Sequence, residues 1–80
     1  MTDEEIIIAL QENTRRIEGL KGLHVAVITK TIEDYEDAEV DEHFINAQKV
    51  QLQKVNALIK DLEGRNRRLL KRLGLPLTEN

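Results

Sequence analysis

The feature that most constrains this chain is a run of residues spaced alternately three and four apart between positions 45 and 73. The run consists of Ile45, Gln48, Leu52, Val55, Ile59, Leu62, Asn66, Leu69 and Leu73. Side chains at this spacing lie along one side of an α-helix, and all but Gln48 and Asn66 are apolar. The pattern predicts a long amphipathic helix over about 41–73, whose apolar side is widened by Phe44, Leu58 and Leu70.

The N-terminal half of the chain carries a second helical pattern, over about 3–36. At 100° per residue, its apolar side chains between Ile6 and Tyr35 fall within one sector. That sector continues past Gly19 and Gly22, so we expect one continuous helix with both glycines on its polar side. A strand over 24–29, which would need a partner strand, and a bend at the two glycines are the alternatives.

Capping residues mark the ends of both predicted helices. Thr2 and Glu5 have the spacing of a capping box, Asp41 is placed to cap the second helix, and Gly74 is placed to end it. An acidic turn over about 37–40 separates the helices, and residues 74–80 are expected to form a flexible tail. The predicted fold is therefore all-α, a long antiparallel helical hairpin forming a single domain over 1–80.

The predicted apolar sides are wider than a contact between two helices requires. We expect the chain to cover this surface with copies of itself, as a homodimer or higher oligomer that forms a four-helix bundle. A different protein partner, or a three-helix monomer bent at the glycines, are the alternatives. The predicted oligomer interface consists of Ile6, Leu10, Ile17, Leu52, Val55, Ile59, Leu62 and Leu69.

Charge is distributed unevenly along the chain. Residues 33–42 carry seven acids and no base, and residues 65–72 carry five bases and no acid. The acidic turn is a candidate surface for a protein partner, through Glu33, Asp34, Glu36, Asp37 and Glu39. The basic end is a candidate site for nucleic-acid phosphates or another anion, through Arg65, Arg67, Arg68, Lys71 and Arg72. The hairpin would also bring this basic end beside the acids at 3–5, which could neutralise it.

Several polar residues fall on or near the predicted inner sides of the helices. These are Asn13, Thr14, His24, Gln48 and Asn66. Such residues either satisfy one another or hold a small anionic ligand between protomers. Asn66 is expected to share a layer with Asn13 and to fix the register of the helices, since a lone Asn in a heptad seam has that effect.

The absence of cysteine and serine removes disulfides, thiolate metal sites and the usual catalytic nucleophiles. No helix-based metal motif is present, so we expect no enzyme activity, no cofactor and no metal. No apolar run reaches the roughly 18 residues of a membrane span, and the acidic N-terminus differs from a secretion signal. The sequence therefore predicts a cytoplasmic, homo-oligomeric interaction or regulatory protein, such as an adaptor, inhibitor or assembly factor. Nucleic-acid binding is the first alternative, and small-anion binding is the second.

Overall fold

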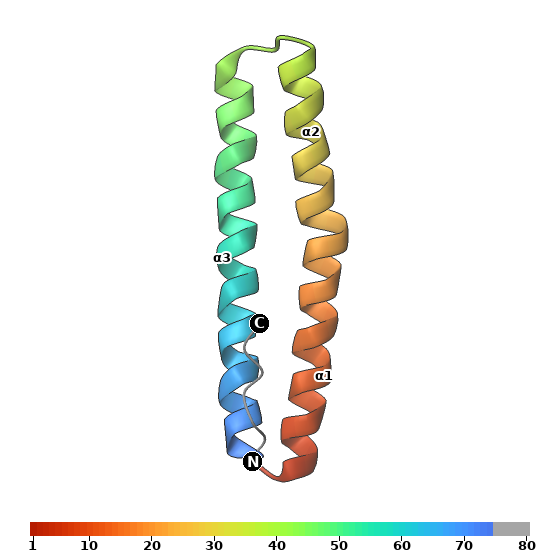
Figure 1. Cartoon of the computed structure of the whole chain (residues 1–80), viewed down its shortest axis with the longest axis vertical. Helices are drawn as coiled ribbons and strands as arrows, with labels where there is room; N and C mark the ends of the chain where they lie inside the picture. The colour runs from red at the N-terminus through yellow and green to blue at the C-terminus, as the bar shows by residue number, and fades with distance from the viewer. Residues whose placement is uncertain (75–80) are drawn as a thin grey trace.

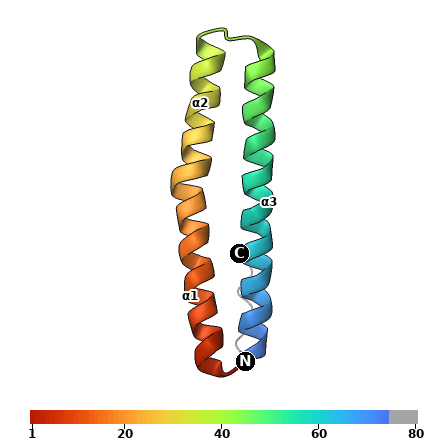
Figure 2. The same cartoon turned by 180° about the vertical axis from the view of Figure 1, so that it is seen from behind.

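Two long helical rods lie side by side and antiparallel in the computed structural model, which describes residues 1–74 (Figures 1 and 2). The first rod consists of α1 (Asp3–Gly19), the π-helical segment η1 (Leu20–Val25) and α2 (Ala26–Asp37). The second rod is α3 (Glu42–Arg72). The prediction of an all-α hairpin is confirmed, and the molecule measures 52 × 19 × 18 Å. Within residues 1–74, no helix is both long and apolar enough to cross a bilayer.

The helix ends are stabilised by the predicted capping residues. The Thr2 hydroxyl accepts a hydrogen bond from the Glu5 backbone N–H at 3.2 Å, and the Glu5 carboxylate accepts one from the Thr2 N–H at 3.2 Å. Asp41 accepts a hydrogen bond from the His43 backbone N–H at 2.9 Å. Gly74 follows α3 with φ +74°, a conformation that glycine adopts without steric cost. The rest of the predicted tail, 75–80, lies outside the described residues.

The turn between the rods is a Schellman motif built without glycine. The Val40 N–H donates to the Tyr35 carbonyl at 3.0 Å, and the Glu39 N–H donates to the Glu36 carbonyl at 3.2 Å. Glu39 has φ 54°, which costs an L-residue about 1–2 kcal/mol relative to a right-handed conformation. Val40 and Tyr35 are both half-buried, as expected for the apolar contact that accompanies this motif.

The core is a narrow apolar seam between the two rods. Its central cluster consists of Ile17, Ile28, Ile32, Val55, Ile59 and Leu62. Leu62 is the most deeply buried side chain, with 1% of its surface exposed. The remaining positions of the three-four run in α3 are half-buried. The sequence pattern of α3 therefore identified the side of this helix that contacts the first rod.

The first rod differs from the predicted uniform helix at η1. Its seam residues are Ile6, Leu10, Asn13, Ile17 and Leu20, followed by Val25, Ile28, Ile32 and Tyr35. The steps between them are three or four residues except for one step of five, between Leu20 and Val25. A π-helical turn hydrogen-bonds residues five apart and so contains one extra residue. The segment η1 lies across this step and keeps both halves of the rod facing α3.

The prediction that helical phase is kept across the glycines is therefore wrong by one residue. An uninterrupted α-helix would continue the seam after Leu20 through His24 and Val27, yet both side chains are exposed. The apolar sector obtained at 100° per residue is broad enough to include both Val27 and Val25. It therefore does not show which of the two continues the seam after Leu20. A methyl group at Gly19 or Gly22 would meet no atom within 4 Å, so neither glycine is required by close packing.

Deleting Gly22 should convert the five-residue step into a four-residue step and η1 into α-helix. We expect the melting temperature to rise by about 4–8 °C, because removing a helix-interior glycine is worth about 1 kcal/mol. Thermal unfolding followed by circular dichroism would measure this change. Deletion of the exposed Arg15 is the matched control, and it should lower the melting temperature because it breaks the spacing between Asn13 and Ile17. Equal destabilisation by both deletions would contradict the register explanation.

Candidate functional site

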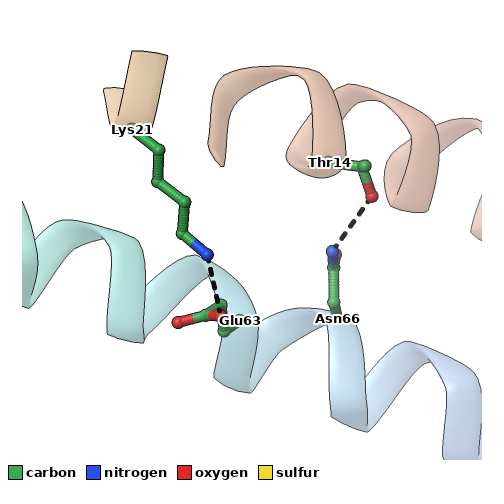
Figure 3. A network of polar contacts seen from close by, with 4 residues as sticks. All are labelled: Thr14, Lys21, Glu63 and Asn66. Atoms are coloured by element: carbon green, nitrogen blue, oxygen red, sulfur yellow. Dashed lines mark hydrogen bonds and ion pairs between the residues drawn. The ribbon is translucent and has the colours of Figure 1, made fainter. Parts of the chain in front are cut away.

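Polar side chains join the two rods along one edge of the seam (Figure 3). The Asn66 side-chain amide donates to the Thr14 hydroxyl at 3.4 Å, and the Lys21 ammonium lies 3.7 Å from the Glu63 carboxylate. Both pairs connect α3 to the first rod and so contribute to its register. The Lys21–Glu63 pair is largely exposed, and an exposed pair of this kind contributes at most about 1 kcal/mol.

Two of the five predicted inter-helix polar residues, Asn66 and Thr14, are paired with each other across the seam. Thr14 directly follows Asn13, the residue with which Asn66 is expected to share a layer. The Oδ1 atom of Asn66 is buried and has no hydrogen-bond partner. An unpartnered buried oxygen costs free energy, so Asn66 weakens the seam while it restricts the alignment of the rods.

The other predicted inter-helix residues do not converge on one site. Asn13 and Gln48 are half-buried at seam positions in opposite halves of the hairpin. His24 is exposed, which corrects the expectation that it lies on the inner side. The cause is η1, since its extra residue places Val25 at the seam position that His24 would otherwise occupy. The described residues therefore provide no shared polar pocket containing all five of these side chains.

The basic end of α3 forms a shallow cationic groove against α1. Arg65, Arg68 and Arg72 line this groove together with Asn13 and Leu69. Arg65 is also 3.0 Å from Asp61, and Arg72 contacts the Met1 sulfur at 3.7 Å. The remaining two predicted bases, Arg67 and Lys71, are exposed and do not line the groove. Three of the five predicted bases are thus brought together.

The expected neutralisation of this basic end is not formed. Among residues 1–74, no ion pair joins Asp3, Glu4 or Glu5 to the bases of α3. Glu5 instead accepts hydrogen bonds from Thr2 in the capping box. All three acids lie in the first turn of α1, where negative charge complements the helix dipole. Among the three arginines of the groove, Arg65 is paired with Asp61, and the ion pairs of residues 1–74 include neither Arg68 nor Arg72.

The acidic turn and the end of α2 form an acidic tip at the far end of the hairpin from the cationic groove. All five predicted partner-binding acids in it are exposed: Glu33, Asp34, Glu36, Asp37 and Glu39. Asp34 forms an ion pair with Lys30 at 3.0 Å, and this hydrogen bond and charge raise the pKa of Lys30. The acids do not surround a pocket. Within residues 1–74, no group of three acids or histidines is arranged to bind a metal ion.

Some exposed apolar side chains differ from the sequence prediction, which places Val27, Phe44 and Leu58 on the apolar sides of the helices. Leu23 and Val27 are 66% and 61% exposed, and they line an apolar groove with His24 and Ile28. Phe44 and Leu58 on α3 are 56% and 38% exposed. The five-residue step between Leu20 and Val25 is the feature of the sequence that indicates the exposure of Val27, because it moves this residue out of the seam.

The residues of the predicted oligomer interface line the seam of a single chain. They are Ile6, Leu10, Ile17, Leu52, Val55, Ile59, Leu62 and Leu69, and each is buried or half-buried. Their contact with a second chain stays a prediction.

Comparisons with protein-family models, with curated proteins and with solved structures find no match to this chain.

Replacing Asn66 with Leu should stabilise the hairpin. The substitution removes the unpartnered Oδ1 atom at similar volume, and the exposed Thr14 hydroxyl can bond to water instead. We expect the free energy of unfolding in urea to rise by about 1 kcal/mol. Asn56→Leu, at an exposed position of the same helix, is the control and should change stability little. A loss of stability in the Asn66 variant would contradict this prediction, because it would mean that the hydrogen bond to Thr14 stabilises the hairpin by more than the unpartnered Oδ1 atom destabilises it.

Proposed function

We propose that this chain is a small, non-enzymatic, homo-oligomeric interaction protein that acts through its helical surfaces as an adaptor, inhibitor or assembly factor. The observation that carries the proposal is the exposure of large apolar side chains along an elongated two-helix hairpin. In residues 1–74 the exposed large apolar side chains are Met1, Ile7, Ile8, Leu23, Val27, Phe44, Val50 and Leu58. Contiguous apolar surface marks interaction sites in soluble proteins, and Leu23 and Val27 together line one apolar groove.

The shape of the molecule supports the same proposal. The radius of gyration is 16.7 Å, against roughly 12 Å expected for a compact domain of this length. The accessible surface is 6299 Å², against roughly 4,900 Å² expected for a compact monomer of this mass. Two rods enclose only a single seam, so much of the apolar surface of each helix stays in contact with water. Association with other helices removes that surface from water and is favourable.

The two charged ends are suited to choosing and orienting partners. The acidic tip and the cationic groove lie at opposite ends of a molecule about 52 Å long. Separated charges of opposite sign steer encounter and disfavour wrong arrangements, and they contribute more to specificity than to affinity. The proposed interaction protein would therefore bind through apolar side chains and be oriented by its ends.

The mass of the native protein tests this proposal directly. We expect native mass spectrometry to give an even multiple of the 9.2 kDa chain, without added mass from a ligand. Sedimentation over a dilution series is the control, because a specific oligomer dissociates reversibly and an aggregate does not. A mass of 9.2 kDa at every concentration would reject the homo-oligomer.

The second candidate function is binding of nucleic-acid phosphates, favoured by the three arginines that line one groove. Each phosphate contact releases counterions. A plot of the logarithm of the binding constant against the logarithm of the salt concentration should therefore have a slope of about −0.9 for each contact. Fluorescence anisotropy with a short RNA or DNA duplex would measure this slope. Under this candidate, an Arg68→Glu, Arg72→Glu variant should lose binding, whereas the control Lys54→Glu, Lys60→Glu should lose far less. Equal losses in both variants, or no binding by the unmodified chain, would exclude it.

A further inference from the structure

One stripe on α3 has an apolar residue at its centre, an aromatic residue at one end and arginines at the other. Phe44, Gln51, Leu58, Arg65 and Arg72 recur every seven residues, and each directly precedes a seam residue. We call these five residues the Leu58 stripe. Leu58 lies at its centre, fourteen residues from Phe44 near the acidic tip and fourteen from Arg72 at the basic end. Each end is about 21 Å from Leu58 along the helix.

The Leu58 stripe lies on the edge of the hairpin opposite the Lys21–Glu63 pair. Glu63 directly follows the seam residue Leu62, and residues that follow and precede seam positions flank the seam on opposite edges. The cationic groove confirms this placement, because Arg65 and Arg72 line it against α1. On the first rod, Leu23 is two residues from Lys21 and so points to the other side of the helix. The apolar groove of Leu23 and Val27 therefore borders the same edge as the stripe.

We propose that a second copy of this chain docks antiparallel on the Leu58 stripe, with the two-fold axis passing at Leu58. This inference rests on the proposed homo-oligomeric function and specifies its interface. In a two-fold arrangement the same patch contacts itself, so apolar residues near the axis meet their own copies. Leu58 is at mid-length of α3, and Leu23 is near mid-length of the first rod. Both belong to the exposed apolar surface that a partner would cover.

Charge complementarity favours the antiparallel over the parallel orientation. Antiparallel docking places the acidic tip of one copy beside the basic end of the other, and it does so twice in each dimer. At the basic end the five bases outnumber Asp3, Glu4 and Glu5, so the end remains positive. Parallel docking would instead bring two tips of seven acids together, and like charges placed side by side are unfavourable.

The ends of the stripe also fit each other in the antiparallel orientation. With the axis at Leu58, Phe44 of one copy lies opposite Arg72 of the other, and Gln51 lies opposite Arg65. An arginine over an aromatic face is attracted to it, and Phe44 is exposed and available for such a contact. The same stripe would place Phe44 against Phe44 and Arg72 against Arg72 in a parallel dimer, where the arginines repel.

Single-cysteine variants test the orientation, because the natural chain contains no cysteine. The variants are Leu58→Cys, Phe44→Cys, Arg72→Cys and the control Val50→Cys, each treated with a short thiol-reactive bifunctional linker. We expect Leu58→Cys to cross-link to itself in most molecules. Phe44→Cys and Arg72→Cys should cross-link only when mixed with each other, because positions 44 and 72 are about 42 Å apart along the helix. Val50 is exposed but lies off the stripe, so its variant should not cross-link.

Each other outcome overturns a defined part of the inference. Self-cross-linking of Phe44→Cys would establish a parallel dimer. Cross-linking of Val50→Cys as readily as Leu58→Cys, or an uncross-linked Leu58→Cys in a protein of dimeric native mass, would place the interface elsewhere. In these cases the proposed function stands and the interface is rejected. A native mass of one chain would reject both together.

A charge substitution provides a second measurement that does not depend on linker geometry. Leu58→Glu places two like charges at the proposed two-fold axis, and we expect it to raise the dimer dissociation constant at least tenfold. The matched control Val50→Glu should leave the constant unchanged. Circular dichroism should show the same helix content in both variants, since both positions are on the surface of the hairpin. Equal dimer affinity for the two variants would overturn the proposal.

Discussion

The structure depends on one strip of apolar contacts between two helical rods. Seven side chains among the described residues are buried, all of them apolar, and all lie along this strip. A seam so narrow stabilises the hairpin only if both rods present apolar residues to it at most turns. In α3 the unbroken three-four spacing achieves this. The first rod has one residue too many between Leu20 and Val25, and η1 contains that residue.

The same seam determines which surfaces remain for function. The buried apolar residues of both rods contact each other within one chain. The side chains left in contact with water include Val27, which η1 displaces from the seam, its groove neighbour Leu23, and Phe44 and Leu58 on α3. The acidic tip and the basic end are held at opposite ends because the hairpin is straight and long. Function is therefore expected along the edges and at the ends.

The particular errors of sequence reasoning have physical causes. When the apolar sector of a helical wheel is broad, two seams that differ by one residue fit the sequence equally well. The wheel therefore predicts His24 on the inner side, whereas Val25 occupies that position. Charge proximity suggested ion pairs between residues 3–5 and the basic end, but Glu5 is engaged in the local capping box. Asn66 was correctly placed in the seam, while its partner depends on the relative rotation of the rods and proved to be Thr14.

The sequence by itself determined the helices, their caps and the seam of α3, because these depend on contacts between residues a few positions apart. Thr2, Glu5 and Asp41 act within one turn, and the three-four spacing is a property of a single helix. Only the tertiary structure decided the register of the first rod, the partner of Asn66 and the side chains left exposed. These depend on how residues such as Leu20 and Val25 align against α3, and many alignments satisfy the pattern of one helix considered alone. The free energy of the shared seam selects among them, and that quantity belongs to the pair of helices.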